Sequence, residues 1–115
     1  MPRNILVADD DEAMLNIYSR LLNTQDYMVT RASSFAEAAR LIEQNIYDLL
    51  VTDLMFPDGL GTELIKLLEQ KSGQAKSLLV TGSVAELDPV ELPKVYFEKP
   101  FKHELFMTEV AKALD

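Results

Sequence analysis

The chain has 115 residues, no cysteine, and a formal net charge of −8 from 19 acidic and 11 basic side chains. This length predicts one domain with a single core over residues 1–115, and the lack of cysteine excludes a disulfide framework and thiol chemistry. The acidic balance disfavours direct binding to nucleic acid, and no apolar stretch approaches the roughly 20 residues of a membrane-spanning helix, which together predict a soluble, cytoplasmic protein.

Short β-rich runs alternate along the chain with segments of helical periodicity, and no internal repeat interrupts them. The first strand is predicted at Asn4 to Asp9. The following helix would open on Asp11 and Glu12, because acidic side chains are favoured at a helix N-terminus. Its apolar stripe consists of Met14, Leu15, Tyr18, Leu21 and Leu22.

The second strand candidate is Met28 to Ala32, and a helix should follow it because Ser34 and Glu37 have the spacing of a capping box. The run from Leu49 to Thr52 is continuously apolar or β-branched, which is typical of a central strand covered on both faces, and it ends on Asp53. The stripe of the intervening helix consists of Phe35, Ala38, Ala39 and Ile42.

A proline- and glycine-rich turn at residues 57–61 precedes a third helix that reaches toward Ser72. Two more strands are predicted at Ser77 to Thr81 and at Val95 to Glu98, and a last helix begins near Lys102. The core-facing candidates of that helix are Leu105, Phe106, Val110, Ala113 and Leu114.

This order predicts an α/β fold of five βα units, (βα)5, with a doubly wound parallel sheet of five strands. The fourth unit is irregular. Only 12 residues separate Thr81 from Lys94, and they include Pro89 and Pro93, whereas a parallel crossover needs about a dozen or more. We therefore expect the fourth helix, in the segment from Ser83 to Pro93, to be short or broken.

Polar or ionic residues end four of the five predicted strands: Asp9 with Asp10, then Asp53, Thr81 and Lys99. In open α/β sheets the ligand site lies outside the carboxyl ends of the strands, so these groups should meet. A hard cation such as Mg²⁺ prefers oxygen ligands, and Asp10 and Asp53 could supply carboxylate oxygens directly. The pattern predicts a metal site at this edge.

These residues resemble the receiver domains of bacterial two-component response regulators, members of the CheY-like superfamily. The resemblance covers essentially the whole chain and rests on Asp9 and Asp10 after the first strand, Asp53 in VTDLMFPDGLG, Thr81 in LLVTGS and Lys99 in YFEKPF. It implies the flavodoxin-like strand order 2-1-3-4-5. It also implies phosphorelay signalling, in which Asp53 accepts a phosphoryl group from a sensor histidine kinase or phosphotransfer protein.

The resemblance further implies that Mg²⁺ or Mn²⁺ binds to Asp9, Asp10, Asp53 and the backbone carbonyl of Met55. Lys99 would then pair first with Asp53 and afterwards with a phosphate oxygen, and Thr81 would donate its hydroxyl to another. Tyr96 would swing inward as a switch and change the surface of the domain. Such a domain is not an enzyme beyond limited self-phosphorylation and autodephosphorylation.

Several residues also have plainer interpretations. Asp11 and Glu12 are read as helix-start acids rather than ligands. Tyr96 could be ordinary packing on a strand, and the sole histidine, His103, is expected on the exposed first turn of the last helix and not as a phosphodonor. Gly82 is small, which would leave the pocket beside Thr81 open to small phosphodonors.

Other classes of function remain as alternatives. The first is a receiver-like interaction module that is not phosphorylated. A Mg²⁺-dependent phosphohydrolase ranks behind it, since an enzyme of the haloacid dehalogenase type needs a second aspartate two positions after the nucleophile, where this chain has Met55. A flavodoxin-like cofactor binder is disfavoured because acid at residues 9–12 repels a flavin phosphate. The chain is either a stand-alone receiver or one piece of a longer regulator or hybrid kinase, with an unknown effector.

Overall fold

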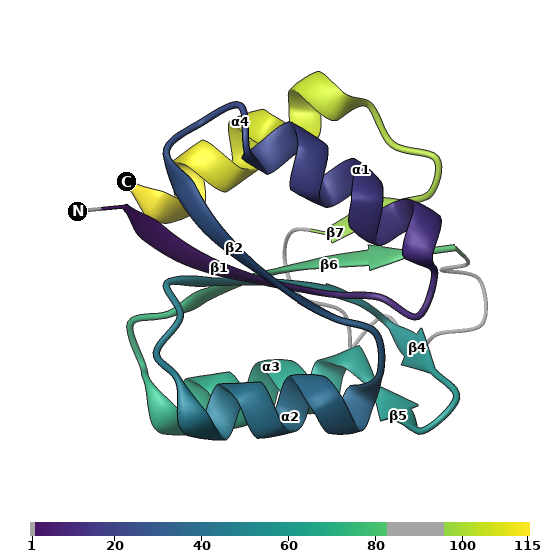
Figure 1. Ribbon diagram of the computed structural model, residues 1–115, viewed down its shortest axis with the longest axis vertical. Coiled ribbons are helices and arrows are strands. Elements are labelled where there is room, and N and C mark those ends of the chain that lie inside the picture. Colours follow the sequence, from purple (N-terminus) through teal and green to yellow (C-terminus); the bar gives the residue numbers. More distant parts are fainter. Residues whose placement is uncertain (1, 83–95) are drawn as a thin grey trace.

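The computed structural model describes residues 2–82 and 96–115 (Figure 1). The segment from Ser83 to Pro93, for which we predicted a short or broken helix, lies outside the described residues. Among the described residues no helix is long and apolar enough to cross a membrane. The strands are β1 (Arg3–Ala8), β2 (Tyr27–Ala32), β3 (Leu49–Asp53), β4 (Met55–Phe56), β5 (Gly59–Leu60), β6 (Lys76–Thr81) and β7 (Tyr96–Glu98), and the helices are α1 (Glu12–Leu22), α2 (Phe35–Gln44), α3 (Gly61–Lys71) and α4 (His103–Leu114).

The main sheet has five parallel strands in the order β2-β1-β3-β6-β7. Numbered by their succession within this sheet, the strands follow 2-1-3-4-5, which confirms the predicted doubly wound topology. Helices α1 and α4 cover one face of the sheet, while α2 and α3 cover the other (Figure 1). The order reverses beside β1, so the carboxyl ends of β1 and β3 lie next to each other.

The central strands are buried on both faces, as their continuous apolar sequences predict. Along β1, Ile5 and Val7 pack with α1 and α4, whereas Leu6 and Ala8 pack with α2 and α3. This alternation follows from the two-residue period of a strand. Two apolar clusters, one on each side of the sheet, therefore hold the strand ends in place.

The helix starts agree closely with the sequence. Asp11 is the N-cap of α1, and its carboxylate accepts the Ala13 backbone N–H at 2.9 Å. Strand β1 ends at Ala8, one residue before the predicted end, because Asp9 already turns toward α1 and accepts the Asp11 N–H at 2.9 Å. The interpretation of Asp11 and Glu12 as helix-start acids is thus confirmed.

The prediction that Leu105 of the last helix faces the core is wrong. Leu105 is 56% exposed, whereas Phe106, Val110 and Leu114 are buried. These three lie four residues apart and form one face of α4, and Leu105 precedes this face by one residue, or about 100° around the helix axis. The apolar pattern alone did not separate the two positions.

Helix α2 is bound at both ends by the segment that follows β3. At its N-terminus the Asp58 carboxylate accepts the backbone N–H groups of Phe35 and Ala36 at 3.0 and 3.1 Å, beside the predicted Ser34 cap. At its C-terminus the Lys71 ammonium of α3 donates to the carbonyls of Ile42, Glu43 and Asn45 at 2.7, 2.5 and 2.9 Å. Backbone groups at both termini of α2 are thus hydrogen-bonded to charged side chains. The negative charge at its N-terminus and the positive charge at its C-terminus both interact favourably with the helix dipole.

Replacing Lys71 with methionine, which keeps the aliphatic stem, should lower the free energy of unfolding by about 1–2 kcal/mol, because charged hydrogen bonds to three carbonyls are lost. Chemical denaturation measures this change. Lys66→Met is the matched control, since Lys66 is an exposed lysine of the same helix. Equal losses in the two variants would show that the terminal contacts contribute no stability.

Candidate functional site

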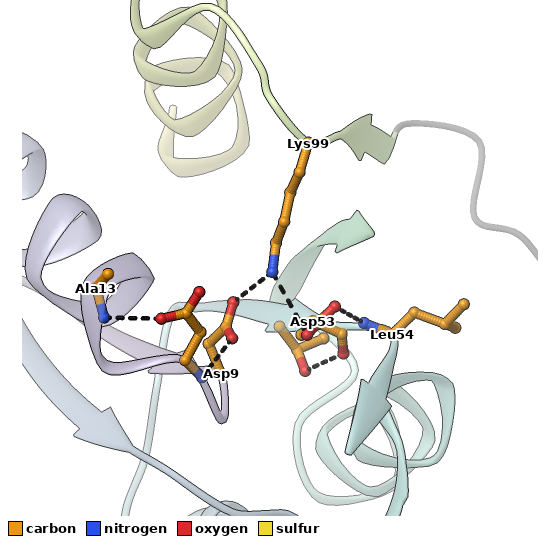
Figure 2. A network of polar contacts seen from close by, with 7 residues as sticks. Asp9, Ala13, Asp53, Leu54 and Lys99 are labelled. Atoms are coloured by element: carbon orange, nitrogen blue, oxygen red, sulfur yellow. Dashed lines mark hydrogen bonds and ion pairs between the residues drawn. The ribbon is translucent and has the colours of Figure 1, made fainter. Parts of the chain in front are cut away.

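The carboxylates that end β1 and β3 face each other across the top of the sheet. Ala8 pairs with Thr52 in the parallel register, which places Asp9 beside Asp53 at the next position. Asp9 is fully buried, and the Asp53 side chain is 13% exposed. One Asp53 oxygen accepts the Leu54 backbone N–H at 2.8 Å, which fixes the direction of the carboxylate (Figure 2).

Lys99 reaches between these two carboxylates from the end of β7 (Figure 2). Its ammonium nitrogen lies 3.0 Å from Asp9 Oδ2 and 3.5 Å from Asp53 Oδ2. The backbone N–H of Lys99 donates to the Thr81 carbonyl at 2.8 Å, and its peptide bond to Pro100 is cis. The ends of three neighbouring strands and of the edge strand thus meet, as the sequence predicts.

Asp10 completes a set of three carboxylates that could hold a cation. One oxygen from each of Asp9, Asp10 and Asp53 lies within 4.8 Å of the others, and Asp10 is exposed to solvent. Carboxylate oxygens with an open side suit Mg²⁺ or Mn²⁺, which keeps waters in its coordination shell. The residues present therefore fit such an ion.

Burial and mutual repulsion disfavour the charged forms of the two inner carboxylates, and Lys99 offsets part of this effect. Burial raises the pKa of Asp9 above its usual value, although the Asp11 N–H and Lys99 act in the opposite direction. Burial, followed by the charge of Asp9, raises the pKa of Asp53. Burial acts to lower the pKa of Lys99, but Asp9 and Asp53 outweigh it and hold that pKa above its usual value.

These shifts predict that Asp53→Asn stabilises the protein at pH 7 without divalent cations. Because the folded state keeps the Asp53 proton to a higher pH than the unfolded chain, the parent protein loses stability as pH rises from about 3.8 through the raised folded pKa. Asparagine removes that loss. Thermal unfolding from pH 3 to pH 8 should show the two proteins converging at the acid end of the range.

The same experiment with Mg²⁺ should reverse the order, because an ion that binds the folded parent more tightly than the variant stabilises the parent by mass action. Asp26→Asn serves as the control, since Asp26 is exposed and lies in the turn between α1 and β2. A parent protein that is more stable than Asp53→Asn at pH 7 without Mg²⁺ would contradict the expected direction.

The other residues singled out in the sequence occupy different settings in the structure. Thr81 is buried at the end of β6, next to Lys99 through their backbone hydrogen bond. Tyr96 begins β7 and is 37% exposed, while the Met55 side chain is 57% exposed beyond Asp53. His103 begins α4 on the surface, as expected, with its ring centroid 6.0 Å from that of Phe101.

Gly61 makes a close backbone contact behind Asp53. The sequence indicated only that this glycine belongs to a turn. A Cβ added to Gly61 would lie 1.9 Å from the Asp53 carbonyl oxygen. That oxygen accepts the hydroxyl of Thr52 at 2.8 Å, and the Gly61 N–H donates to the Leu54 carbonyl at 2.6 Å. Gly61 is therefore needed because of close approach, and its φ is not positive.

Comparison with known proteins gives a consistent result. The sequence model of the family described as "Response regulator receiver domain" matches residues 5–111. The alkaline phosphatase synthesis transcriptional regulatory protein PhoP of Bacillus subtilis is 35% identical over 105 residues, which cover 88% of this chain and 44% of PhoP. The response regulator receiver protein CpdR of Brucella abortus is 28% identical, and the match covers 97% of each chain. The chain thus spans less than half of one relative and nearly all of the other.

A solved structure supports the same fold. The response regulator receiver domain protein (CheY-like) from Methanospirillum hungatei superposes with a TM-score of 0.91 at 27% identity, and the match covers 100% of this chain and 95% of that one. The predicted strand order, the site at the strand ends and the matched sequence model therefore agree.

Proposed function

This chain belongs to the response regulator receiver domain family, and on that basis we propose that Asp53 accepts a phosphoryl group in phosphorelay signalling. The observation that carries the proposal is the arrangement of Asp53, with Lys99 at 3.5 Å and with Asp9 and Asp10 within reach of one shared cation. Members of the family are signalling modules rather than ordinary enzymes. The proposed domain is the whole chain, residues 1–115.

The proposed step is an in-line displacement at phosphorus. An Asp53 carboxylate oxygen forms a bond to the phosphorus of a donor phosphohistidine, while the bond from phosphorus to the imidazole nitrogen breaks and the nitrogen keeps the electron pair. The product is an acyl phosphate on Asp53. Lys99 lies close enough to move from the carboxylates to a phosphoryl oxygen, which offsets the added negative charge.

We assign a Mg²⁺ or Mn²⁺ ion to Asp9, Asp10, Asp53 and the backbone carbonyl of Met55. The ion, when bound, would reduce the repulsion between the attacking carboxylate and the anionic donor. The assignment is supported by the clustered carboxylate oxygens. It also agrees with the raised pKa values of Asp9 and Asp53, for which burial is the largest cause.

The output is proposed to depend on Thr81 and Tyr96. After phosphorylation the Thr81 hydroxyl would donate to a phosphoryl oxygen, and Tyr96 would move inward and change the surface around β7. The position of Thr81 beside Lys99 and the partial exposure of Tyr96 are compatible with this switch. A sensor histidine kinase or phosphotransfer protein is the proposed donor, and an effector domain or protein is the proposed recipient of the signal. The domain itself is proposed to act in the cytoplasm.

Incubation with a small acyl phosphate tests the proposal directly. We expect intact-mass analysis to show the mass of one added phosphoryl group in the presence of Mg²⁺ and much less when the metal is chelated. A Cβ added at Gly82 would meet no atom of the described residues within 4 Å, which is compatible with room for such a donor. Absence of uptake at saturating donor and Mg²⁺ would favour the alternative of an interaction module that is not phosphorylated.

A further inference from the structure

Tyr18 of α1 places a hydroxyl group inside the protein, on the face of the sheet that α1 and α4 cover. Tyr18 is fully buried, with 0% of its surface exposed to solvent. Its hydroxyl has no partner with hydrogen-bond geometry among the described residues. A buried hydroxyl without a partner costs free energy, so a well-packed core would favour phenylalanine here. The hydroxyl therefore needs an explanation.

The ring of Tyr18 is held firmly. It stacks on Phe101 with centroids 6.2 Å apart and an interplanar angle of 7°, and its centroid lies 5.6 Å from that of Phe106. Phe101 follows Lys99 by two residues, so Tyr18 supports the segment that carries the ammonium group. With the ring fixed, the hydroxyl can change its hydrogen bonds only through small movements.

The charged groups that act on this hydroxyl are those of the site. Burial raises the pKa of Tyr18 most, followed by the negative charges of Asp9 and then Asp53, by the approach of the Asp9 carboxylate as a hydrogen-bond acceptor, and last by the charge of Asp11. The contact with Asp9 does not reach hydrogen-bond geometry in the described structure. A neutral tyrosine hydroxyl can act toward a carboxylate only as a hydrogen-bond donor. Among the carboxylates, Asp9 acts most strongly on this hydroxyl, and it is itself fully buried.

We propose that Tyr18 is a positioning residue of the metal site, whose hydroxyl donates to the Asp9 carboxylate when Lys99 leaves it for the phosphoryl group or when a cation displaces it. This inference rests on the proposed function. In the described structure Asp9 Oδ1 accepts the Asp11 N–H, and Oδ2 is held by Lys99 at 3.0 Å.

Departure of Lys99 would leave a fully buried carboxylate oxygen without its donor, which is costly unless another donor replaces it. The Tyr18 hydroxyl is a buried donor with no completed hydrogen bond among the described residues, and the Asp9 carboxylate, which would lose its Lys99 donor, is the acceptor that acts on it most strongly. Donors of this kind orient the carboxylates that bind metals, and their removal typically costs 10- to 100-fold in metal affinity.

The test compares Tyr18→Phe with Tyr47→Phe, which removes a hydroxyl from a mostly buried tyrosine located before β3, at the opposite end of the sheet from the site. Calorimetric titration with Mg²⁺ should show binding about 10-fold weaker in Tyr18→Phe and unchanged in Tyr47→Phe. Without Mg²⁺, Tyr18→Phe should unfold at the same denaturant concentration as the parent or a higher one, because it loses only an unpaired hydroxyl.

A spectroscopic signature separates positioning from simple packing. The chain has four tyrosines and no tryptophan, so its near-ultraviolet emission comes from tyrosine. Mg²⁺ should change this emission in the parent and in Tyr47→Phe, and the change should be lost in Tyr18→Phe. Equal Mg²⁺ affinities for the parent and Tyr18→Phe, or a retained emission change, would overturn the proposed role of Tyr18 but leave the metal assignment intact. A parent protein that binds no Mg²⁺ would overturn the metal assignment and this inference with it.

Discussion

Replacing Asp53 with asparagine should abolish phosphoryl uptake from a small acyl phosphate, with a loss of at least about 100-fold in the labelling rate, since removing a nucleophile leaves only binding and electrostatic effects. The amide has nearly the same shape as the carboxylate but lacks its negative oxygen. The other groups of the site remain in place, including Lys99 at 3.0 Å from Asp9. Intact-mass analysis over time measures the rate.

The control for this experiment is Asp26→Asn, which removes one exposed carboxylate away from the site and should take up phosphate at the parent rate. Unfolding curves of the two variants establish that both are folded. Full labelling of Asp53→Asn would place the acceptor elsewhere and remove the basis of the proposed function. Loss of labelling in both variants would show that net charge, rather than this carboxylate, controls the reaction.

Replacing Gly61 with alanine should have the second largest effect, because the new methyl group would lie 1.9 Å from the Asp53 carbonyl oxygen, and that contact is with backbone. The start of α3 or the end of β3 must shift. We expect a loss of about 3 kcal/mol in the free energy of unfolding, the range seen for overpacked cores, together with slower phosphoryl uptake. Denaturant unfolding and the mass assay measure the two effects.

Gly73→Ala is the matched control, since a Cβ at Gly73 would meet no atom within 4 Å in residues 2–82 and 96–115. This variant should stay within about 0.5 kcal/mol of the parent and label at the same rate. If Gly61→Ala were as stable as Gly73→Ala, the close approach behind Asp53 would not constrain the site. A destabilised Gly61→Ala that labels normally would separate the packing of this segment from its chemistry.

The sequence alone predicted the main parts of the site because each part ends a strand. Asp9, Asp53 and Lys99 follow β-rich runs directly, and the carboxyl ends of parallel strands meet at one edge, so adjacency followed from topology. The helix starts at Asp11 and Ser34 followed from local patterns of the same kind, whereas the strand order followed from the resemblance to receiver domains. Local pattern and global fold agree at these positions.

The features that the sequence did not reveal depend on contacts between distant residues. Lys71 and Asp58 looked like ordinary surface charges, because nothing nearby in the sequence shows that they bind the ends of α2. Lys71 is 26 to 29 residues away from its partners at the C-terminus of α2. Asp58 is 22 to 23 residues away from its partners at the N-terminus. Tyr18 fitted an apolar stripe, which carries no information about the position of its hydroxyl. Leu105 had the right residue type but the wrong direction on its helix.

The binding of α2 at both termini has a consequence for recombining receiver domains. The donors and acceptors that hold this helix, Asp58 and Lys71, are encoded after it, whereas the helix itself spans Phe35–Gln44. A crossover between residues 46 and 57 would join α2 of one parent to Asp58 and Lys71 of another. Chimeras with crossovers before residue 34 or after residue 71 inherit the helix and both of these residues from one parent, and these chimeras should fold more often.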